Sequence, residues 1–289
     1  MPEIAEVWNI AMETTVLLDV RLDSSINESV TPFGQCWLNP RLESVELLTP
    51  FKGFDPQTLA LRNRQVTAIL HRGKTMGLKL APIGIRASTI IRIGFGMTGR
   101  LSLKEEKNAR ARFNFEKGRS IYYIDPRKFG SIRTHYGETL GYYPFHGVEA
   151  NLLSTDELVE FCKSRRKIRS VLTDQSLIVG LGNYMVNEIL YKARIHPLRR
   201  ADSLNLTELK VVRDTVLETI LESVRAGGAT LSDYYSLSGK RGSYQEQFQA
   251  YKQTKCNRCS NEIIRLKAPG SQSSFVCETC APLNSISSN

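Results

Sequence analysis

Four cysteines near the C-terminus constrain the fold of this chain more than any other sequence feature. Cys256 and Cys259 form one C-x-x-C pair, Cys277 and Cys280 form a second, and 17 residues separate the two pairs. This spacing is typical of a tetrahedral zinc ribbon, in which a hairpin brings two thiolate pairs onto one ion. A segment this small has little core of its own, so metal binding would supply its folding free energy. The sequence therefore predicts one structural zinc ion.

Length and composition predict a folded intracellular protein. Of 289 residues, 41% are hydrophobic and 24% are charged, which excludes a disordered or fibrous chain. No apolar run reaches the roughly 18 residues that a membrane span needs. Glu3 and Glu6 stand where a signal peptide carries basic residues. We therefore expect a cytoplasmic protein without membrane association, in which Cys36 and Cys162 are core thiols.

Positive charge is concentrated in two segments of the chain. Lys and Arg number 39 against 29 Asp and Glu, a formal net charge of +10. Residues 57–104 contain no acidic residue, and a second basic cluster occupies residues 163–169. Such stretches favour a polyanionic partner, because each phosphate contact releases condensed counterions. The alternative is a basic surface that is simply solvated.

Hydrophobic periodicity divides the chain into a β-rich part and a helical part. An apolar stripe at helical spacing predicts a helix that begins near residue 2 and includes Ile4, Val7, Trp8 and Ala11. Alternating runs at 90–95 and 112–116 predict a β-sandwich that continues to about residue 136. Further on, apolar spacing between Leu206 and Val224 predicts a long helix. Asn205 and Glu208 form its capping pair, and Gly227 and Gly228 end it.

The first residues also suggest nucleophilic chemistry. Removal of Met1 before Pro2 would leave a free secondary amine. An α-amino group is on the order of 10% neutral at pH 7, against about 0.04% for an ordinary lysine. Such an amine attacks carbonyl-like carbon and gives an iminium directly. Glu3 and Glu6 lie on one helix face, where either could move protons, although favourable interaction with the helix dipole also explains them.

Short motifs in a fixed order along the chain resemble those of one protein family. They lie at residues 2–7, 72–74, 96–99, 125–130, 174–176, 180–184, 188–190, 196–197, 228–234 and 239–244, and they are followed by the four cysteines. On these motifs, which extend over residues 2–280, the chain resembles the Fpg/Nei family of DNA glycosylases with abasic-site lyase activity.

The resemblance implies a bilobal α+β enzyme that holds DNA in a cleft. Its parts would be an N-terminal catalytic domain, a linker, a helix-two-turn-helix DNA-binding domain, a zinc finger and a flexible tail. The catalytic domain would combine the N-terminal helix with the β-sandwich. These parts correspond to residues 1–136, 137–151, 152–252, 253–283 and 284–289. The implied partner is double-stranded DNA that contains damaged bases or abasic sites, bound by a monomer and, in a bacterium, associated with the nucleoid.

The resemblance also implies the catalytic residues. Pro2 would be the nucleophile that attacks C1′ of a damaged nucleotide, and Glu3 would be the acid/base that opens the sugar. Glu6 matches a second carboxylate that supports the site, and Lys74 matches a lysine that contacts phosphate.

A second set of residues would bind DNA around the lesion. Met97, Arg127 and Phe129 match the wedge that fills the void left by a flipped base. The alternatives are core positions for the two apolar residues and a surface charge, paired with Asp125, for the arginine. The implied phosphate ligands are Arg169, Asn183 and Gln272. Gln272 departs from the family, because it replaces an arginine and adds no charge.

The leading hypothesis is therefore a glycosylase/lyase of base excision repair that removes an oxidised base through a Pro2 Schiff base and then carries out β,δ-elimination. One alternative is a non-catalytic protein that binds damaged DNA on the same scaffold. Another is a transcription or ribosomal factor with a zinc ribbon, which leaves residues 2–6 and 125–130 unexplained. The choice between oxidised purines and pyrimidines stays open, and residues 231–244 are expected to influence it.

Overall fold

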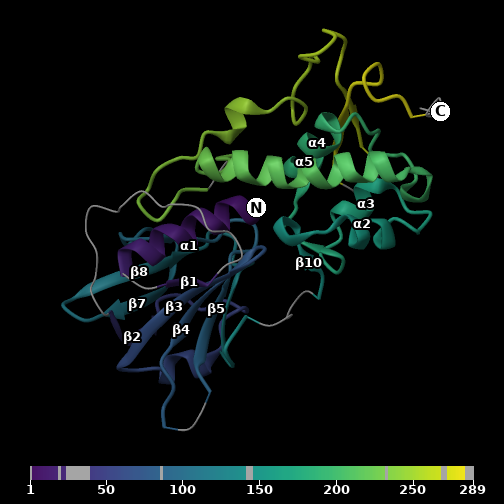
Figure 1. Cartoon of the computed structure of the whole chain (residues 1–289). Helices are drawn as coiled ribbons and strands as arrows, with labels where there is room; N and C mark the ends of the chain where they lie inside the picture. Colours follow the sequence, from purple (N-terminus) through teal and green to yellow (C-terminus); the bar gives the residue numbers. More distant parts are fainter. Residues whose placement is uncertain are drawn as a thin grey trace. The chain divides into compact units, whose positions relative to one another are not determined.

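The computed structural model describes residues 2–18, 21–23, 40–84, 87–140, 146–231, 234–267 and 272–283. Cys36 and the predicted flexible tail lie outside these residues, as does part of the predicted linker. The chain forms two compact units (Figure 1). The first contains Met1–Tyr143 with Ser223–Ser243, and the second contains Pro144–Glu222 with Tyr244–Asn289. Among the described residues, no helix is both long and apolar enough to cross a bilayer.

The first unit begins with helix α1 (Ile4–Leu18). The apolar stripe predicted from the sequence is confirmed, because Ile4, Val7, Trp8 and Ala11 are at most 1% exposed. The helix begins at Ile4 rather than at residue 2, since the Glu6 carboxylate accepts the backbone N–H of Glu3 at 2.7 Å. This contact has the geometry of a capping interaction, which places Glu3 just before the first helical residue.

The β-rich part of the first unit is a nine-stranded sheet in the described residues. Its strands are β1 (Arg21–Asp23), β2 (Arg41–Leu47), β3 (Arg64–Arg72), β4 (Thr75–Leu80), β5 (Thr89–Gly94), β6 (Arg100–Ser102), β7 (Ala109–Phe115), β8 (Arg119–Ile124) and β9 (Ser131–Tyr136). The order is β6-β8-β7-β2-β3-β4-β5-β9, with β1 parallel to β3. A short 3-10 helix, η1 (Pro56–Ala60), precedes β3.

One hydrophobic core joins the two halves of this sheet. Residues of β7 and β8, such as Phe113 and Tyr123, belong to the same buried cluster as Ile69 of β3 and Ile91 of β5. Strands from both ends of the hydrogen-bonded path therefore face a common interior, as expected for a β-sandwich. Helix α1 packs against β3 and β4 (Figure 1).

The second unit is mostly helical. Its helices are α2 (Thr155–Phe161), α3 (Ile168–Leu172), α4 (Asn183–Lys192) and most of α5 (Leu206–Arg225), with short 3-10 helices η2 (Ala150–Leu152), η3 (Ala201–Ser203) and η4 (Tyr244–Gln247). Strands β10 (Val148–Glu149) and β11 (Ile178–Val179) pair in parallel, and β12 (Ile264–Leu266) and β13 (Ser274–Val276) form an antiparallel hairpin.

The predicted boundaries of the long helix are confirmed. The Asn205 side chain accepts the Glu208 N–H and the Glu208 carboxylate accepts the Asn205 N–H, both at 2.9 Å. Gly227 and Gly228 follow the last helical residue with φ values of +74° and +84°. Glycine adopts this left-handed conformation without steric cost, so the helix ends there.

Candidate active site and nucleic-acid interface

The first turn of α1 is tied to a loop that follows α5. One oxygen of the Glu6 carboxylate accepts the N–H of Glu3, and the other accepts the N–H of Ala229 at 2.6 Å. The Tyr234 hydroxyl donates to the Glu6 carbonyl at 3.4 Å. Glu3 and Glu6 are only 3% and 1% exposed. The predicted second carboxylate is thus buried between the start of α1 and residues 226–243, which we call the 226–243 loop.

Three of the four predicted catalytic residues, Pro2, Glu3 and Glu6, are buried in the first unit. Pro2 is buried immediately before α1, and Lys74 lies half-buried in the turn between β3 and β4. Burial lowers the pKa of Lys74, while the negative charges of Glu3 and Glu6 act in the opposite direction. The structure therefore places the predicted lysine within the electrostatic reach of both predicted carboxylates.

His71 is a neighbour of this cluster to which the sequence interpretation assigned no role. It lies near the end of β3 and is 7% exposed, and its ring centroid is 5.6 Å from that of Trp8. Burial lowers the pKa of His71 to about 4, although backbone hydrogen bonds with Gly73 and Ile4 oppose this shift. The imidazole is therefore neutral at pH 7, and it connects the start of α1 to the turn that carries Lys74. The sequence does offer one sign that His71 neighbours the site, because it lies three residues before Lys74.

The predicted wedge residues lie on two adjacent turns. Met97 and Phe129 are 43% and 58% exposed, which confirms exposed loop positions rather than core positions. The Arg127 guanidinium lies 4.9 Å from the centre of the Phe129 ring. The turns approach closely: Gly96 has φ +58°, and a Cβ there would stand 2.6 Å from the Phe129 carbonyl carbon.

Asp125 holds these two turns together. Its carboxylate accepts the Thr98 hydroxyl at 2.6 Å and the Gly130 N–H at 2.8 Å, and the residue is fully buried. The Thr98 hydroxyl also accepts the Arg127 N–H at 3.3 Å. Sequence reasoning considered Asp125 only as a partner for Arg127 and missed this organising role.

In the second unit, the predicted phosphate ligands Arg169 and Asn183 are in direct contact. The Arg169 guanidinium donates to the Asn183 side-chain oxygen at 2.7 Å. Asn183 is the first residue of α4, and a helix N-terminus favours anions. Burial lowers the pKa of Arg169. The arrangement presents a guanidinium beside a helix start, which suits a phosphate group.

Asn187 joins this helix to the C-terminal hairpin. Its amide donates to the Asn183 carbonyl at 2.6 Å, and its side-chain oxygen accepts the Phe275 N–H at 2.7 Å. Gln272, the departure from the family arginine, is exposed two residues before β13. The hairpin is therefore held against α4, and Gln272 is exposed beside β13.

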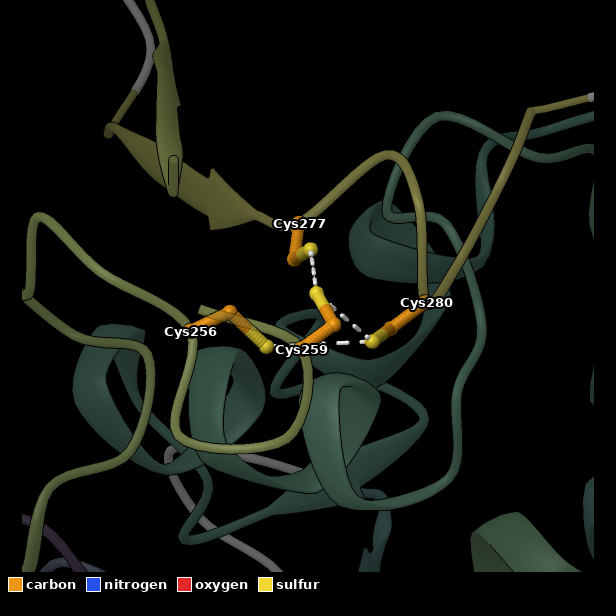
Figure 2. A group of neighbouring side chains, drawn as sticks. All are labelled: Cys256, Cys259, Cys277 and Cys280. Carbon is orange, nitrogen blue, oxygen red and sulfur yellow. Dashed lines mark hydrogen bonds between the residues drawn. The ribbon is translucent and has the colours of Figure 1, made fainter. Parts of the chain in front are cut away.

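The four cysteines meet beside the β12–β13 hairpin (Figure 2). Their sulfur atoms all lie within 4.8 Å of one another, with Cys256–Cys280 at 3.7 Å and Cys259–Cys277 at 3.4 Å. Tetrahedral zinc at about 2.3 Å from each sulfur separates the sulfurs by about 3.8 Å, so the set fits such an ion. The cluster can therefore bind a metal ion. Cys162 is separate and buried, as predicted.

Comparisons with known proteins agree with this geometry. Residues 1–132 match the formamidopyrimidine-DNA glycosylase N-terminal domain, and residues 149–235 match the formamidopyrimidine-DNA glycosylase H2TH domain. A formamidopyrimidine-DNA glycosylase of Bacillus cereus is 30% identical over 295 residues, which cover 98% of this chain and 99% of the relative. The chain belongs to the formamidopyrimidine-DNA glycosylase family. Membership confirms the predictions of a DNA glycosylase of base excision repair with abasic-site lyase activity.

Further relatives support the family assignment and the fold. A formamidopyrimidine-DNA glycosylase of Halalkalibacterium halodurans is 34% identical over 200 residues, covering 64% of this chain and 72% of the relative. The crystal structure of MutM (Fpg) from Thermus thermophilus has a TM-score of 0.80 at 26% identity and covers 96% of this chain and 98% of its own. A complex of Lactococcus lactis Fpg with abasic-site DNA shares the fold, with a TM-score of 0.79 at 24% identity over 97% of this chain and 99% of its own.

Proposed function

We propose that this chain removes oxidised bases, formamidopyrimidine lesions among them, from double-stranded DNA with Pro2 as its nucleophile. The observation that carries the proposal is the buried group of Pro2, Glu3 and Glu6 at the start of α1, with the half-buried Lys74 of the β3–β4 turn within the electrostatic reach of both carboxylates. Relatives that align with nearly the whole chain are formamidopyrimidine-DNA glycosylases, which supports formamidopyrimidines as substrates.

The reaction begins when the Pro2 nitrogen bonds to C1′ and the C1′–base bond breaks. The proton lost from the Pro2 nitrogen passes to the departing base. Glu3 donates a proton to O4′ as the C1′–O4′ bond breaks, which opens the sugar ring and leaves an iminium between Pro2 and C1′, and the Glu3 carboxylate then accepts the C2′ proton. The resulting iminium acidifies the C2′ proton, so its removal expels the 3′ phosphate by β-elimination. A second elimination expels the 5′ phosphate, and water then releases Pro2. The role of Glu6 is to hold the backbone of Glu3, and Lys74 supplies positive charge.

DNA would be bound by a monomer through the remaining predicted residues. Met97, Arg127 and Phe129 would occupy the space of the flipped base, because they are exposed on turns that Asp125 holds together. Arg169 and Asn183 would bind a phosphate, with Gln272 contributing a neutral hydrogen bond. Binding should weaken steeply as salt rises, because phosphate contacts release counterions. A DNA substrate also favours the predicted cytoplasmic, nucleoid-associated location.

The four cysteines would hold one structural zinc ion as thiolates. All four ligand positions are supplied by the protein, so the ion has no open site for a substrate, and its part is to fold the hairpin.

A panel of duplexes tests the proposal. Each duplex carries one lesion, either a formamidopyrimidine, 8-oxoguanine, an oxidised pyrimidine or an abasic site, and nicking is followed with the wild-type chain and with a Pro2→Glu variant. We expect wild-type nicking of the formamidopyrimidine and abasic duplexes and its loss in Pro2→Glu, which retains Met1 and blocks the amine. Damage-specific binding without strand cleavage by the wild-type chain would instead establish the non-catalytic alternative.

A further inference from the structure

The exposed apolar side chains of the first unit form two separate groups. Among its described residues, the large hydrophobic side chains that are at least 36% exposed are Leu59, Ile83, Met97, Phe129 and Tyr136. Met97 and Phe129 form the proposed wedge. Ile83 and Tyr136, which are 62% and 60% exposed, line a cavity, and Leu59 precedes Ala60 of the same cavity. The second group has no part in the proposed reaction.

This cavity has a volume of about 400 Å³, within the roughly 300–1,000 Å³ typical of ligand pockets. Its walls come from η1, from Ile83 and Ala87 between β4 and β5, and from the ends of β3, β5 and β9. The apolar lining includes Ala60, Leu61 and Ile83, and the polar lining includes Arg62 and Arg64. None of the described residues that line it is acidic. The cavity is therefore both apolar and positively charged.

The register of the sheet places this cavity far from the proposed wedge. Thr89 pairs with Tyr136 at one end of the β5–β9 ladder, and both line the cavity. Gly94 pairs with Ser131 at the other end, next to the turns that carry Met97 and Phe129. Five steps of about 3.4 Å separate the two ends by roughly 17 Å. A ligand in the cavity would not occupy the position of the flipped base.

The two arginines offer a fixed and an adjustable positive charge. The Arg64 side chain is held in place, because its Nε donates to the Ala81 carbonyl at 3.0 Å and the residue is 8% exposed. Arg62 is exposed, so its guanidinium can turn towards an incoming anion. An apolar hollow lined by an aromatic side chain and arginines has the composition of a protein interface, where aromatic residues and arginine are enriched.

We propose that the cavity docks an acidic segment of a partner protein. A bulky apolar side chain of the segment would enter between Ile83 and Tyr136, and neighbouring carboxylates would pair with Arg62 and Arg64. The apolar walls suit a side chain better than a phosphodiester backbone, which favours a peptide over nucleic acid. The docking requires none of the residues placed in catalysis.

Fluorescence anisotropy with the full-length chain tests the docking. The ligand is a labelled peptide, Asp-Glu-Asp-Leu-Phe-Asp-Glu, and the control peptide has alanine at the Leu and Phe positions. We expect saturable binding of the first peptide in the micromolar range, as is usual for small interfaces. Arg62→Glu and Tyr136→Ala should each weaken it at least about tenfold. Lys107→Glu, an exposed charge reversal away from the cavity, should leave it unchanged.

Nicking of an abasic duplex separates this proposal from the proposed function. All three variants should nick at the wild-type rate, because the altered side chains are exposed and none of them belongs to the proposed catalytic or DNA-binding residues. Equal binding of the two peptides, equal binding by Arg62→Glu and wild type, or no saturation would overturn the docking proposal. Loss of duplex binding in Arg62→Glu and Tyr136→Ala would show that the surface contacts DNA, and this result would overturn the proposal as well.

Discussion

The carboxylate of Glu6 bonds to the backbone of Ala229, which lies 223 positions later in the chain. The same carboxylate holds the N–H of Glu3, so one side chain fixes both the start of α1 and the 226–243 loop. Gly228 is required for this approach, because a Cβ at that position would stand 2.8 Å from the Glu6 Cγ. One carboxylate therefore links the loop to Glu3, the residue that follows the proposed nucleophile.

Replacement of Glu6 should reduce the rate of the chemical step. In Glu6→Gln an NH2 group faces one of the two buried N–H donors, so that donor loses its acceptor. Leaving a buried donor without an acceptor costs about 1–3 kcal/mol. We expect the single-turnover rate on an abasic duplex to fall roughly 5- to 150-fold, with little change in duplex affinity. The matched control is Glu13→Gln, since the half-buried Glu13 accepts the Ser238 N–H of the same loop at 3.0 Å. A wild-type rate in Glu6→Gln would show that the contact has no role in positioning.

Asp125 should matter for base removal more than for strand cleavage. Asp125→Ala removes the acceptor of Thr98 and Gly130, so the turns carrying Met97 and Phe129 lose their common anchor. We expect excision from a lesion duplex to slow at least about tenfold, while nicking of a pre-formed abasic site changes less, because the wedge offsets the cost of flipping. Thr98→Val should show a smaller effect of the same kind. Equal losses on both duplexes would indicate general destabilisation instead.

Local signals in the sequence predicted much of this fold, and contacts distant in sequence explain what was missed. The limits of α5 follow from Asn205, Glu208 and the two glycines, all within a few residues of the helix ends. The cysteine spacing likewise predicted a cluster that the hairpin brings together. These features depend on short stretches of chain, so periodicity and spacing are sufficient to identify them.

The roles of Asp125 and Ala229 could not be predicted in this way. The partners of Asp125 depend on the pairing of β5 with β9, which places the 96–99 and 126–130 turns side by side. The Glu6–Ala229 contact depends on the 226–243 loop, which is anchored in the first core by Tyr234 and Leu237. The cavity beside Arg62 likewise combines separate segments of the chain.

His71 should make the stability of the protein depend on pH. Its pKa is about 4 in the folded state and about 6.5 when unfolded. The unfolded state therefore binds more protons between these values, and stability is lost as pH falls below about 6.5. Because of this residue, the free energy of unfolding falls by about 2 kcal/mol between pH 7 and pH 5. Urea unfolding of wild type and His71→Gln at both pH values checks this, and the variant should lack that part of the pH dependence. The same pH dependence in both proteins would contradict the assignment.

Removal of metal should unfold the C-terminal hairpin and weaken DNA binding. We expect one zinc ion per chain by elemental analysis, and loss of duplex affinity after chelation, because the hairpin contacts α4 through Asn187. Cys259→Ser should lose the metal, whereas the control Cys162→Ala should retain it, since Cys162 lies outside the cluster. A chelated chain that binds duplex as well as before would contradict this role.

The position of the covalent bond to DNA tests the central claim most directly. Borohydride reduction of the chain on an abasic duplex, followed by trypsin digestion and mass spectrometry, locates the sugar remnant. We predict the remnant on the N-terminal nitrogen of the peptide from Pro2 to Arg21, with Met1 absent. A remnant on Lys74, or full nicking activity without any trapped adduct, would contradict the assignment of Pro2 as the nucleophile.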